Sequence, residues 1–229
     1  MGVPFMSAPE RTLQRTLRVA ELAMVQFVAG VLIAIGVQGG RFQPLNDFLS
    51  ILGTRQHPAP WIFNGTIMIL GAGLMWFFIS LATLASRGRF GLLTCCSWGI
   101  SCAAALMVVG LCPWDRWPFL HTSAFLGWIL FLIPMSEAWW CWACEWYSSS
   151  FRCWLLNKLV LVVAVAYFPL GLFGLGPLWQ KVVVFTSYFW IGCFLLQLRW
   201  VIARGQMFRI QMDSSHSLYE ELEFRSRQD

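Results

Sequence analysis

Four polar residues of types that do acid, base or nucleophile chemistry fall between apolar stretches of the chain. Asp47 and Ser50 lie in the segment 38–60, and Asp115 and His121 lie in a hairpin further along. An Asp, a His and a Ser that approach one another can form an activated nucleophile with its base. Asp with His can also bind a divalent metal, although no metal site is predicted here. If the protein is an enzyme, these four residues are the predicted catalytic set.

Each of these residues also has a structural interpretation. Asp115 lies in the sequence CPWDRWP, where its side chain can close a turn by accepting a backbone N–H, and His121 can cap the helix that follows. A hydrolase is expected to place more than one histidine on its working side, and His57 is the second candidate there. We therefore favour the structural interpretation over the catalytic one.

Three further polar residues are candidates for ligand binding. Asn64 lies about one turn into the second apolar stretch, and Arg116 adjoins Asp115 in the hairpin. Glu137 lies inside the fourth apolar stretch, where a carboxylate is costly unless it is paired, and a cytoplasmic arginine is the expected partner. The functional hypothesis for Glu137 is a proton-linked or lipid-headgroup role, but burial against a neighbouring helix explains it equally well.

The elements that carry these residues are predicted to be transmembrane helices. Charged residues make up 12% of the 229 residues and apolar residues 58%, which is far from the composition of a soluble domain. The apolar residues form six runs that approach the roughly 20 residues needed to cross a bilayer core. In lipid such runs must be helices, because every backbone amide and carbonyl has to be paired. The predicted fold is an all-α, polytopic six-helix membrane bundle with spans at 20–37, 61–85, 91–112, 121–147, 159–176 and 182–203.

The distribution of Lys and Arg predicts that both termini are cytoplasmic. With the N-terminus inside, twelve of the 16 basic residues lie in cytoplasmic segments, as the positive-inside rule favours. The net charge of +5 is thus mainly a topology signal that suits anionic lipid headgroups, and nucleic-acid binding is not expected. The basic residues on the outer side are Arg41, Arg55, Arg116 and Lys181.

Two polar segments flank the predicted six-helix domain at 20–203. Residues 1–19 contain a Ser-x-x-Glu capping box at Ser7 and Glu10, followed by arginines at helical spacing, which predicts a short cytoplasmic amphipathic helix at the membrane interface. Residues 204–229 are polar and of mixed charge, so a cytoplasmic tail is predicted. Between the first two spans, the pattern over 44–53 predicts a short capped helix that ends at Gly53.

Several short motifs occur in an order that resembles a known family. They are LSILG at 49–53, IFNG at 62–65, Gly71, GLCPWD at 110–115, Pro118, His121, Ala124 and Pro134. Together they resemble an uncharacterised prokaryotic family of six-span membrane proteins, which is itself distantly similar to the damage-regulated autophagy modulator group. The resemblance covers roughly residues 20–200 and implies the fold and topology, but no established activity.

These observations lead to three functional hypotheses. The first is a non-enzymatic component that binds membrane lipids or a larger membrane complex through its Trp-rich and small-residue helix faces. The second is a membrane-embedded lipid-acting hydrolase or transferase that uses Asp47, Ser50, Asp115 and His121. The third is a small-solute or proton-coupled transporter that uses Glu137 and the proline-kinked helices. No cofactor is expected, because no phosphate-binding glycine loop or haem motif is present, and the expected location is a bacterial or archaeal inner membrane.

Overall fold

The computed structural model describes residues 8–85, 90–146 and 176–203, together with single positions between 155 and 166. All regular elements in these ranges are helices, which confirms the all-α prediction for this part of the chain. In chain order they are α1 (Ala8–Val37), the short 3-10 helix η1 (Leu49–Gly53), α2 (Pro60–Ala85), α3 (Phe90–Leu111), α4 (Pro118–Trp146) and α6 (Gly176–Ala203).

Five of the described helices are long and apolar enough to cross a membrane, with mean hydropathies between 1.5 and 2.1. They correspond to the first, second, third, fourth and sixth predicted spans. The predicted span 159–176 lies almost entirely outside the described residues. The candidate membrane-crossing segments are Arg11–Val37, Pro60–Thr83, Gly91–Leu111, Pro118–Trp142 and Gly176–Trp200.

Three of these helices begin at or beside a proline. α2 starts at Pro60, α4 starts at Pro118, and α6 carries Pro177 in its first turn. Proline is tolerated there because the first N–H groups of a helix have no intrahelical acceptor, and its fixed φ already suits a helix. α6 therefore begins at Gly176, earlier than the predicted start at 182.

The first helix is longer than the sequence pattern indicates. α1 runs without interruption from Ala8, so the short helix expected within 1–19 is continuous with the first span. Its early turns belong to the core of the bundle, since the side chains of Leu13 and Leu17 are 0% and 3% exposed. Ser7 of the capping box and the predicted tail at 204–229 lie outside the described residues.

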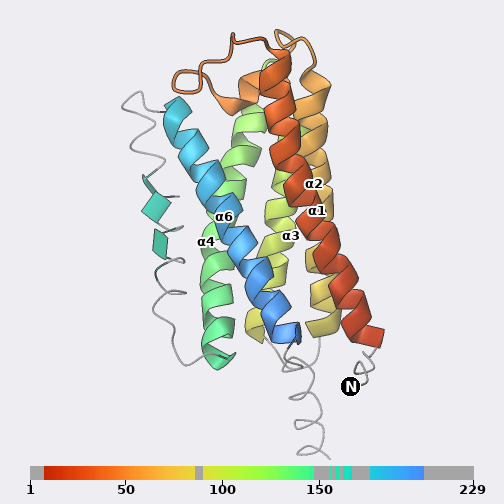
Figure 1. Ribbon diagram of the computed structural model, residues 1–229. Coiled ribbons are helices and arrows are strands. Elements are labelled where there is room, and N and C mark those ends of the chain that lie inside the picture. The colour runs from red at the N-terminus through yellow and green to blue at the C-terminus, as the bar shows by residue number, and fades with distance from the viewer. Residues whose placement is uncertain are drawn as a thin grey trace, which may run out of the picture.

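The helices α1 to α4 form an up-and-down bundle in which consecutive helices are antiparallel neighbours (Figure 1). Short connections favour this arrangement, and each of the three consecutive helix pairs is in extensive contact. The loop end of the bundle is where α1 ends and where α2, α4 and α6 begin (Figure 1). α6 consequently runs parallel to α4 rather than antiparallel to it.

Glycines on α2 let its backbone approach both neighbouring helices closely. A Cβ atom at Gly71 would lie 2.6 Å from Met107 Cγ and 2.8 Å from the carbonyl oxygen of Ala103 on α3. A Cβ atom at Gly73 would lie 2.6 Å from the Cβ of Ala23 on α1. Helices in lipid gain stability from close backbone packing of this kind, because the hydrophobic effect does not draw them together there.

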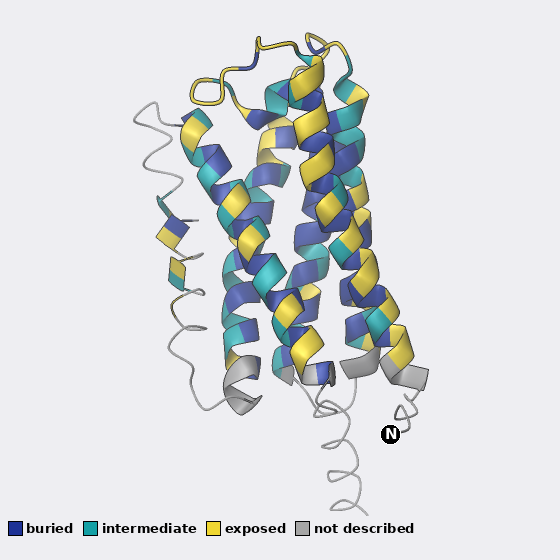
Figure 2. Cartoon of the chain, viewed as in Figure 1, coloured by how far each residue is buried: buried dark blue, intermediate teal, exposed yellow. Residues whose placement is uncertain are grey.

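Long side chains attach α6 to the other helices. Phe194 is 1% exposed, and its ring lies 4.2 Å from that of Trp139 on α4 and 5.9 Å from the rings of Phe77 and Phe78 on α2, measured between centroids. Trp190 of α6 stacks on Phe194 from the same helix. We call these five residues the aromatic cluster. Figure 2 shows the buried side of the helices turned toward one another, with exposed residues on the outside of the bundle.

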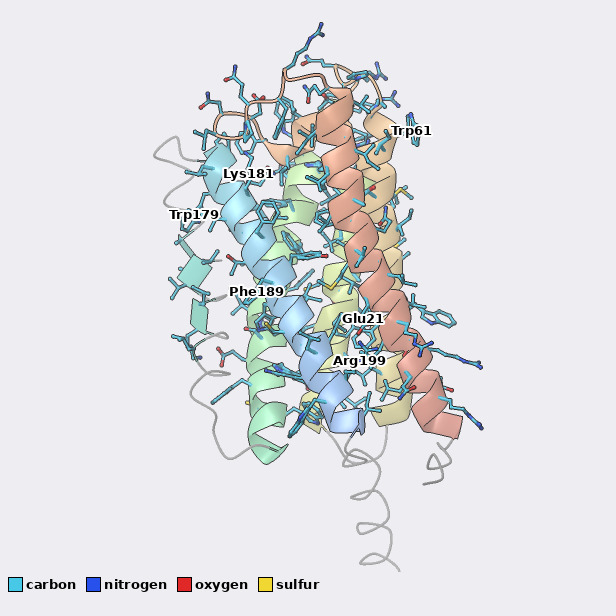
Figure 3. The ribbon with its side chains drawn as sticks, viewed as in Figure 1. Glu21, Trp61, Trp179, Lys181, Phe189 and Arg199 are labelled. Atoms are coloured by element: carbon cyan, nitrogen blue, oxygen red, sulfur yellow. The ribbon has the colours of Figure 1, made fainter. Side chains whose placement is uncertain are left out.

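A second set of contacts joins α6 to α1. The Tyr188 hydroxyl donates a 2.6 Å hydrogen bond to the carbonyl oxygen of Met24, and its ring lies 5.7 Å from that of Phe27. At the opposite end from the loops, Arg199 and Glu21 form an ion pair at 3.3 Å (Figure 3). These contacts tie the sixth predicted span to the first along most of its length.

Candidate lipid-binding site

The segment that joins α1 to α2 folds over the loop end of the bundle. It leaves α1 through Gly39 and Gly40, whose positive φ angles of 62° and 80° make a turn. The Asp47 carboxylate accepts a 2.7 Å hydrogen bond from the backbone N–H of Gln43, and the Asp47 carbonyl oxygen accepts one from the Lys181 ammonium of α6. Because Asp47 closes this turn, the helix predicted over 44–53 is reduced to η1 at Leu49–Gly53.

Ser50 and His121 line one internal cavity below the loop end. The cavity measures about 60 Å³, room for about two water molecules, and lies among η1 and the helices α1, α2, α3, α4 and α6. Its walls are almost wholly apolar and include Phe63, Leu106 and Trp128. The aromatic cluster fills the bundle further along α2 and α6, away from the loop end.

The His121 ring supports the end of the preceding helix. His121 is 6% exposed, and its Nδ1–H donates a 2.8 Å hydrogen bond to the carbonyl oxygen of Cys112, just beyond α3. This hydrogen bond satisfies one of the carbonyls that a helix end leaves without an internal partner. It also assigns the proton of the neutral ring to Nδ1, so that Nε2 is the acceptor.

Asn64, Asp115 and Arg116 come together with Arg55 at the loop end of α2 and α3. Asp115 accepts a 3.1 Å hydrogen bond from the backbone N–H of Arg55, and the Asn64 amide donates a 2.9 Å hydrogen bond to the carbonyl oxygen of Gly53. The depression between them, which we call the arginine bowl, has a volume of about 430 Å³. It is lined by Gly53, Arg55, Pro60, Trp61, Asn64, Gly65, Met68, Gly110, Leu111, Pro113, Asp115, Arg116 and Trp117.

An apolar groove of about 330 Å³ runs between α1 and α2 and meets the arginine bowl at Trp61 and Gly65, which line both. Trp61 projects from the start of α2 with 73% of its surface exposed (Figure 3). A Cβ atom at Gly65 would meet no other atom within 4 Å, so this glycine keeps the groove open rather than allowing close helix packing. The groove is lined by Gln26, Ala29, Gly30, Ile33, Trp61, Ile62, Gly65, Thr66 and Ile69.

One buried polar atom lies at the side of this groove. The Gln26 amide donates a 3.0 Å hydrogen bond to the Thr66 hydroxyl, which ties α1 to α2. The amide oxygen of Gln26 is buried and has no hydrogen-bond partner among the described residues. A buried carbonyl oxygen without a partner is costly, so this oxygen is an unfavourable feature of the α1–α2 contact.

The four predicted catalytic residues are distributed over three places. Asp47 closes the loop turn, Ser50 and His121 line the internal cavity, and Asp115 belongs to the arginine bowl. The group that orients the His121 ring is therefore the backbone carbonyl of Cys112 and not an aspartate side chain. In the described part of the chain, no three His, Cys, Asp or Glu side chains lie close enough together to hold a metal ion.

Glu137 has a lysine as its partner. Its carboxylate lies 2.6 Å from the Lys158 ammonium, and the two side chains are 39% and 33% exposed. The partner predicted from the sequence is a cytoplasmic arginine, and the structure has Lys158 in that role instead. The ion pair neutralises a carboxylate that would otherwise be costly inside the membrane.

Arg55, Trp61 and Gly65 are the parts of this surface that sequence reasoning did not select. The sequence identifies Arg55 only as an outer basic residue, because the side of α2 that faces α1 or α3 cannot be read from a uniformly apolar helix. Comparison of the chain with protein-family models, with characterised proteins and with solved structures gives no match. The resemblance to the six-span family therefore stays a prediction.

Proposed function

We propose that the protein is a non-enzymatic, lipid-binding component of a bacterial or archaeal inner membrane, with six spans and both termini in the cytoplasm. Two observations support the topology. α4 ends at the end of the bundle opposite to the loops and α6 begins at the loop end, and one further span between them in sequence would agree with this arrangement. The excess of Lys and Arg in the segments assigned to the opposite side supports an outer position for the loop end.

The observation that carries the lipid-binding proposal is the adjacency of the apolar groove and the arginine bowl, which share Trp61 and Gly65 in their linings. A phospholipid has the same order of parts, with an acyl chain that fits an apolar groove and a polar headgroup above it. Tryptophan is favoured at the depth where these two parts meet, because its ring is amphipathic. A lipid seated here would place its chain between α1 and α2 and its headgroup in the bowl.

The groove alone does not make lipid binding selective. The interior of the bilayer is as apolar as the groove. Transfer of an acyl chain from the bilayer into the groove therefore gains little hydrophobic free energy. Selective retention of one lipid must come from shape and from polar contacts. The polar side chains of the bowl are the groups that can supply such contacts.

Filling the groove is expected to remove bound lipid without unfolding the protein. Gly65→Leu adds a side chain into open space, and leucine also raises the helix propensity by about 1 kcal/mol. Native mass spectrometry after mild-detergent purification is expected to show one retained lipid on the wild type and about tenfold less on the variant, an effect of about 1.4 kcal/mol. Gly36→Leu is the matched control, since Gly36 also has no atom within 4 Å of its missing Cβ but lies outside the groove.

Equal lipid retention by both leucine variants would overturn the proposed function. The same measurement also reports on the wider version of the hypothesis, in which the protein belongs to a membrane complex. A stoichiometric protein partner released together with the lipid in Gly65→Leu, and retained in Gly36→Leu, would identify this surface as the contact with that complex.

One observation favours the hydrolase or transferase as a second candidate, because Ser50 and His121 line the same cavity. A fluorophosphonate probe, which labels activated serines, separates the two functions. The enzyme hypothesis requires labelling that Ser50→Ala and His121→Ala both abolish. We expect no labelling that depends on Ser50, because the Nδ1–H of His121 donates to a backbone carbonyl and lacks a carboxylate partner that would stabilise the charged form of the ring.

The described contacts do not favour transport. Glu137 is neutralised by Lys158, and the aromatic cluster occupies the bundle between the internal cavity and the end opposite to the loops. A transported solute would need a polar route past these rings, which are almost completely buried. Neither the cavity nor the ion pair supplies that route.

A further inference from the structure

We propose that the arginine bowl binds the phosphate group of a net-anionic phospholipid in the outer leaflet, with Arg55 and Arg116 as the phosphate ligands. This inference rests on the proposed function and adds the class of lipid. It concerns the same surface, but different residues from those that shape the groove. The groove accommodates an acyl chain, whereas the arginine bowl recognises the negative charge of the headgroup.

The two guanidinium groups are available for an external anion. Both arginines are exposed at the loop end, and neither forms an ion pair within the described ranges 8–85, 90–146 and 176–203. The one carboxylate in the bowl, Asp115, instead accepts a hydrogen bond from the backbone N–H of Arg55. Two arginines that line one depression suit a phosphate, because guanidinium donates two parallel hydrogen bonds to such an oxyanion.

The charge of the bowl indicates the charge of its ligand. Arg55 and Arg116 contribute two positive charges and Asp115 one negative charge, which leaves +1. A lipid phosphodiester with an uncharged alcohol carries one negative charge and neutralises this excess. A zwitterionic headgroup leaves the excess charge in place, and free inorganic phosphate brings a second negative charge toward Asp115. The balance therefore favours a lipid of the phosphatidylglycerol type.

The surroundings of the bowl favour a lipid over a soluble phosphate compound. Trp61 and Trp117 stand at its edge with 73% and 57% of their surfaces exposed, which places the bowl at headgroup depth. The Asn64 amide is held by the Gly53 carbonyl oxygen, and the missing side chain of Gly65 joins the bowl to the apolar groove. A ligand with a phosphate and a chain can thus occupy both spaces at once.

Competition between two lipids with identical chains tests this inference. The full-length protein is placed in nanodiscs that contain equal amounts of phosphatidylglycerol and phosphatidylcholine, and the retained lipid is identified by native mass spectrometry. The wild type is expected to enrich phosphatidylglycerol about tenfold, as two exposed charge pairs allow. Arg55→Gln with Arg116→Gln is expected to abolish the enrichment while a lipid is still retained in the groove.

Three controls keep the outcome interpretable. Arg41→Gln removes an exposed arginine from the same loop without touching the bowl, and it is expected to keep the enrichment. The double variant with Arg55→Lys and Arg116→Lys retains both positive charges and is expected to keep part of the enrichment. This result would exclude misfolding as the cause of the loss in the glutamine variant. An excess of soluble glycerol phosphate or inorganic phosphate is expected to leave the retained lipid in place.

Each contrary result has a distinct meaning. Undiminished enrichment in the glutamine variant, or equal retention of both lipids by the wild type, would overturn the phosphate assignment while leaving lipid binding intact. Displacement by soluble phosphate would identify a site for a free anion and also overturn it. A failure of the lipid-binding proposal would be detected separately, because Gly65→Leu would then retain as much lipid as the wild type.

Discussion

Phe194→Ala is expected to lower the free energy of unfolding by about 3 kcal/mol, a typical cost of emptying a buried aromatic site. Phe194 is 1% exposed, and its ring contacts the rings of Trp139, Phe77, Phe78 and Trp190. In lipid the loss comes from packing rather than from hydration, because the separated helices stay in an apolar environment. Unfolding by SDS in mixed micelles, followed by tryptophan fluorescence, measures the change.

A neighbouring phenylalanine on the same helix provides the control. Phe189 is 58% exposed and points away from the bundle (Figure 3), so Phe189→Ala is expected to change the free energy of unfolding by less than about 0.5 kcal/mol. If the two alanine variants unfold at the same SDS fraction, α6 does not depend on the aromatic cluster for its attachment to the other helices.

Gly71→Leu is expected to destabilise the protein by about 3 kcal/mol or to prevent folding, the upper part of the usual range for overpacking. A Cβ atom at Gly71 would already lie 2.8 Å from the Ala103 carbonyl oxygen, and a backbone atom cannot move aside as a flexible side chain can. α2 and α3 would have to separate, and their packing would be lost along both helices. The yield of monodisperse protein and its SDS unfolding midpoint measure the effect.

The same substitution at Gly65 is the control, since both glycines lie on α2 and both variants gain the same side chain and helix propensity. Gly65→Leu is expected to keep the wild-type unfolding midpoint, because its new side chain meets open space. A similar loss of stability in both variants would mean that the α1–α2 groove is closed in the membrane, and it would also weaken the lipid-binding proposal.

The helices could be predicted from the sequence because their signal is local. Long apolar runs determine where a span lies, and the five described helices follow from them. The helix starts were less accurate. Pro177 begins a helix that the apolar count starts at 182, and residues from Ala8 onward continue α1 because Leu13 and Leu17 are buried against other helices. That burial is a property of the assembled bundle and has no local signal.

The site could be predicted only in part. The position of a residue in a loop indicates the end of the bundle at which it lies, but not the helix face or pocket that it lines. Asn64, Asp115 and Arg116 meet in the bowl, as their shared end of the bundle suggested. Asp47 and Ser50 are near in sequence, yet one closes a turn and the other lines the internal cavity. Lys158 was not recognised as a partner of Glu137, since the pairing depends on how two segments pack.

The dependence of α6 on side-chain contacts also bears on how the protein is made. A chain leaves the ribosome from its N-terminus, so α1 to α4 can pair as successive hairpins before α6 has been synthesised. Until then Phe77, Phe78 and Trp139 face lipid or the insertion machinery rather than their partner rings. The internal cavity acquires its last wall, including Gln180 and Tyr188, only when α6 docks. Synthesis of α6 is therefore the step that adds the last of the described helices and the remaining wall of this cavity.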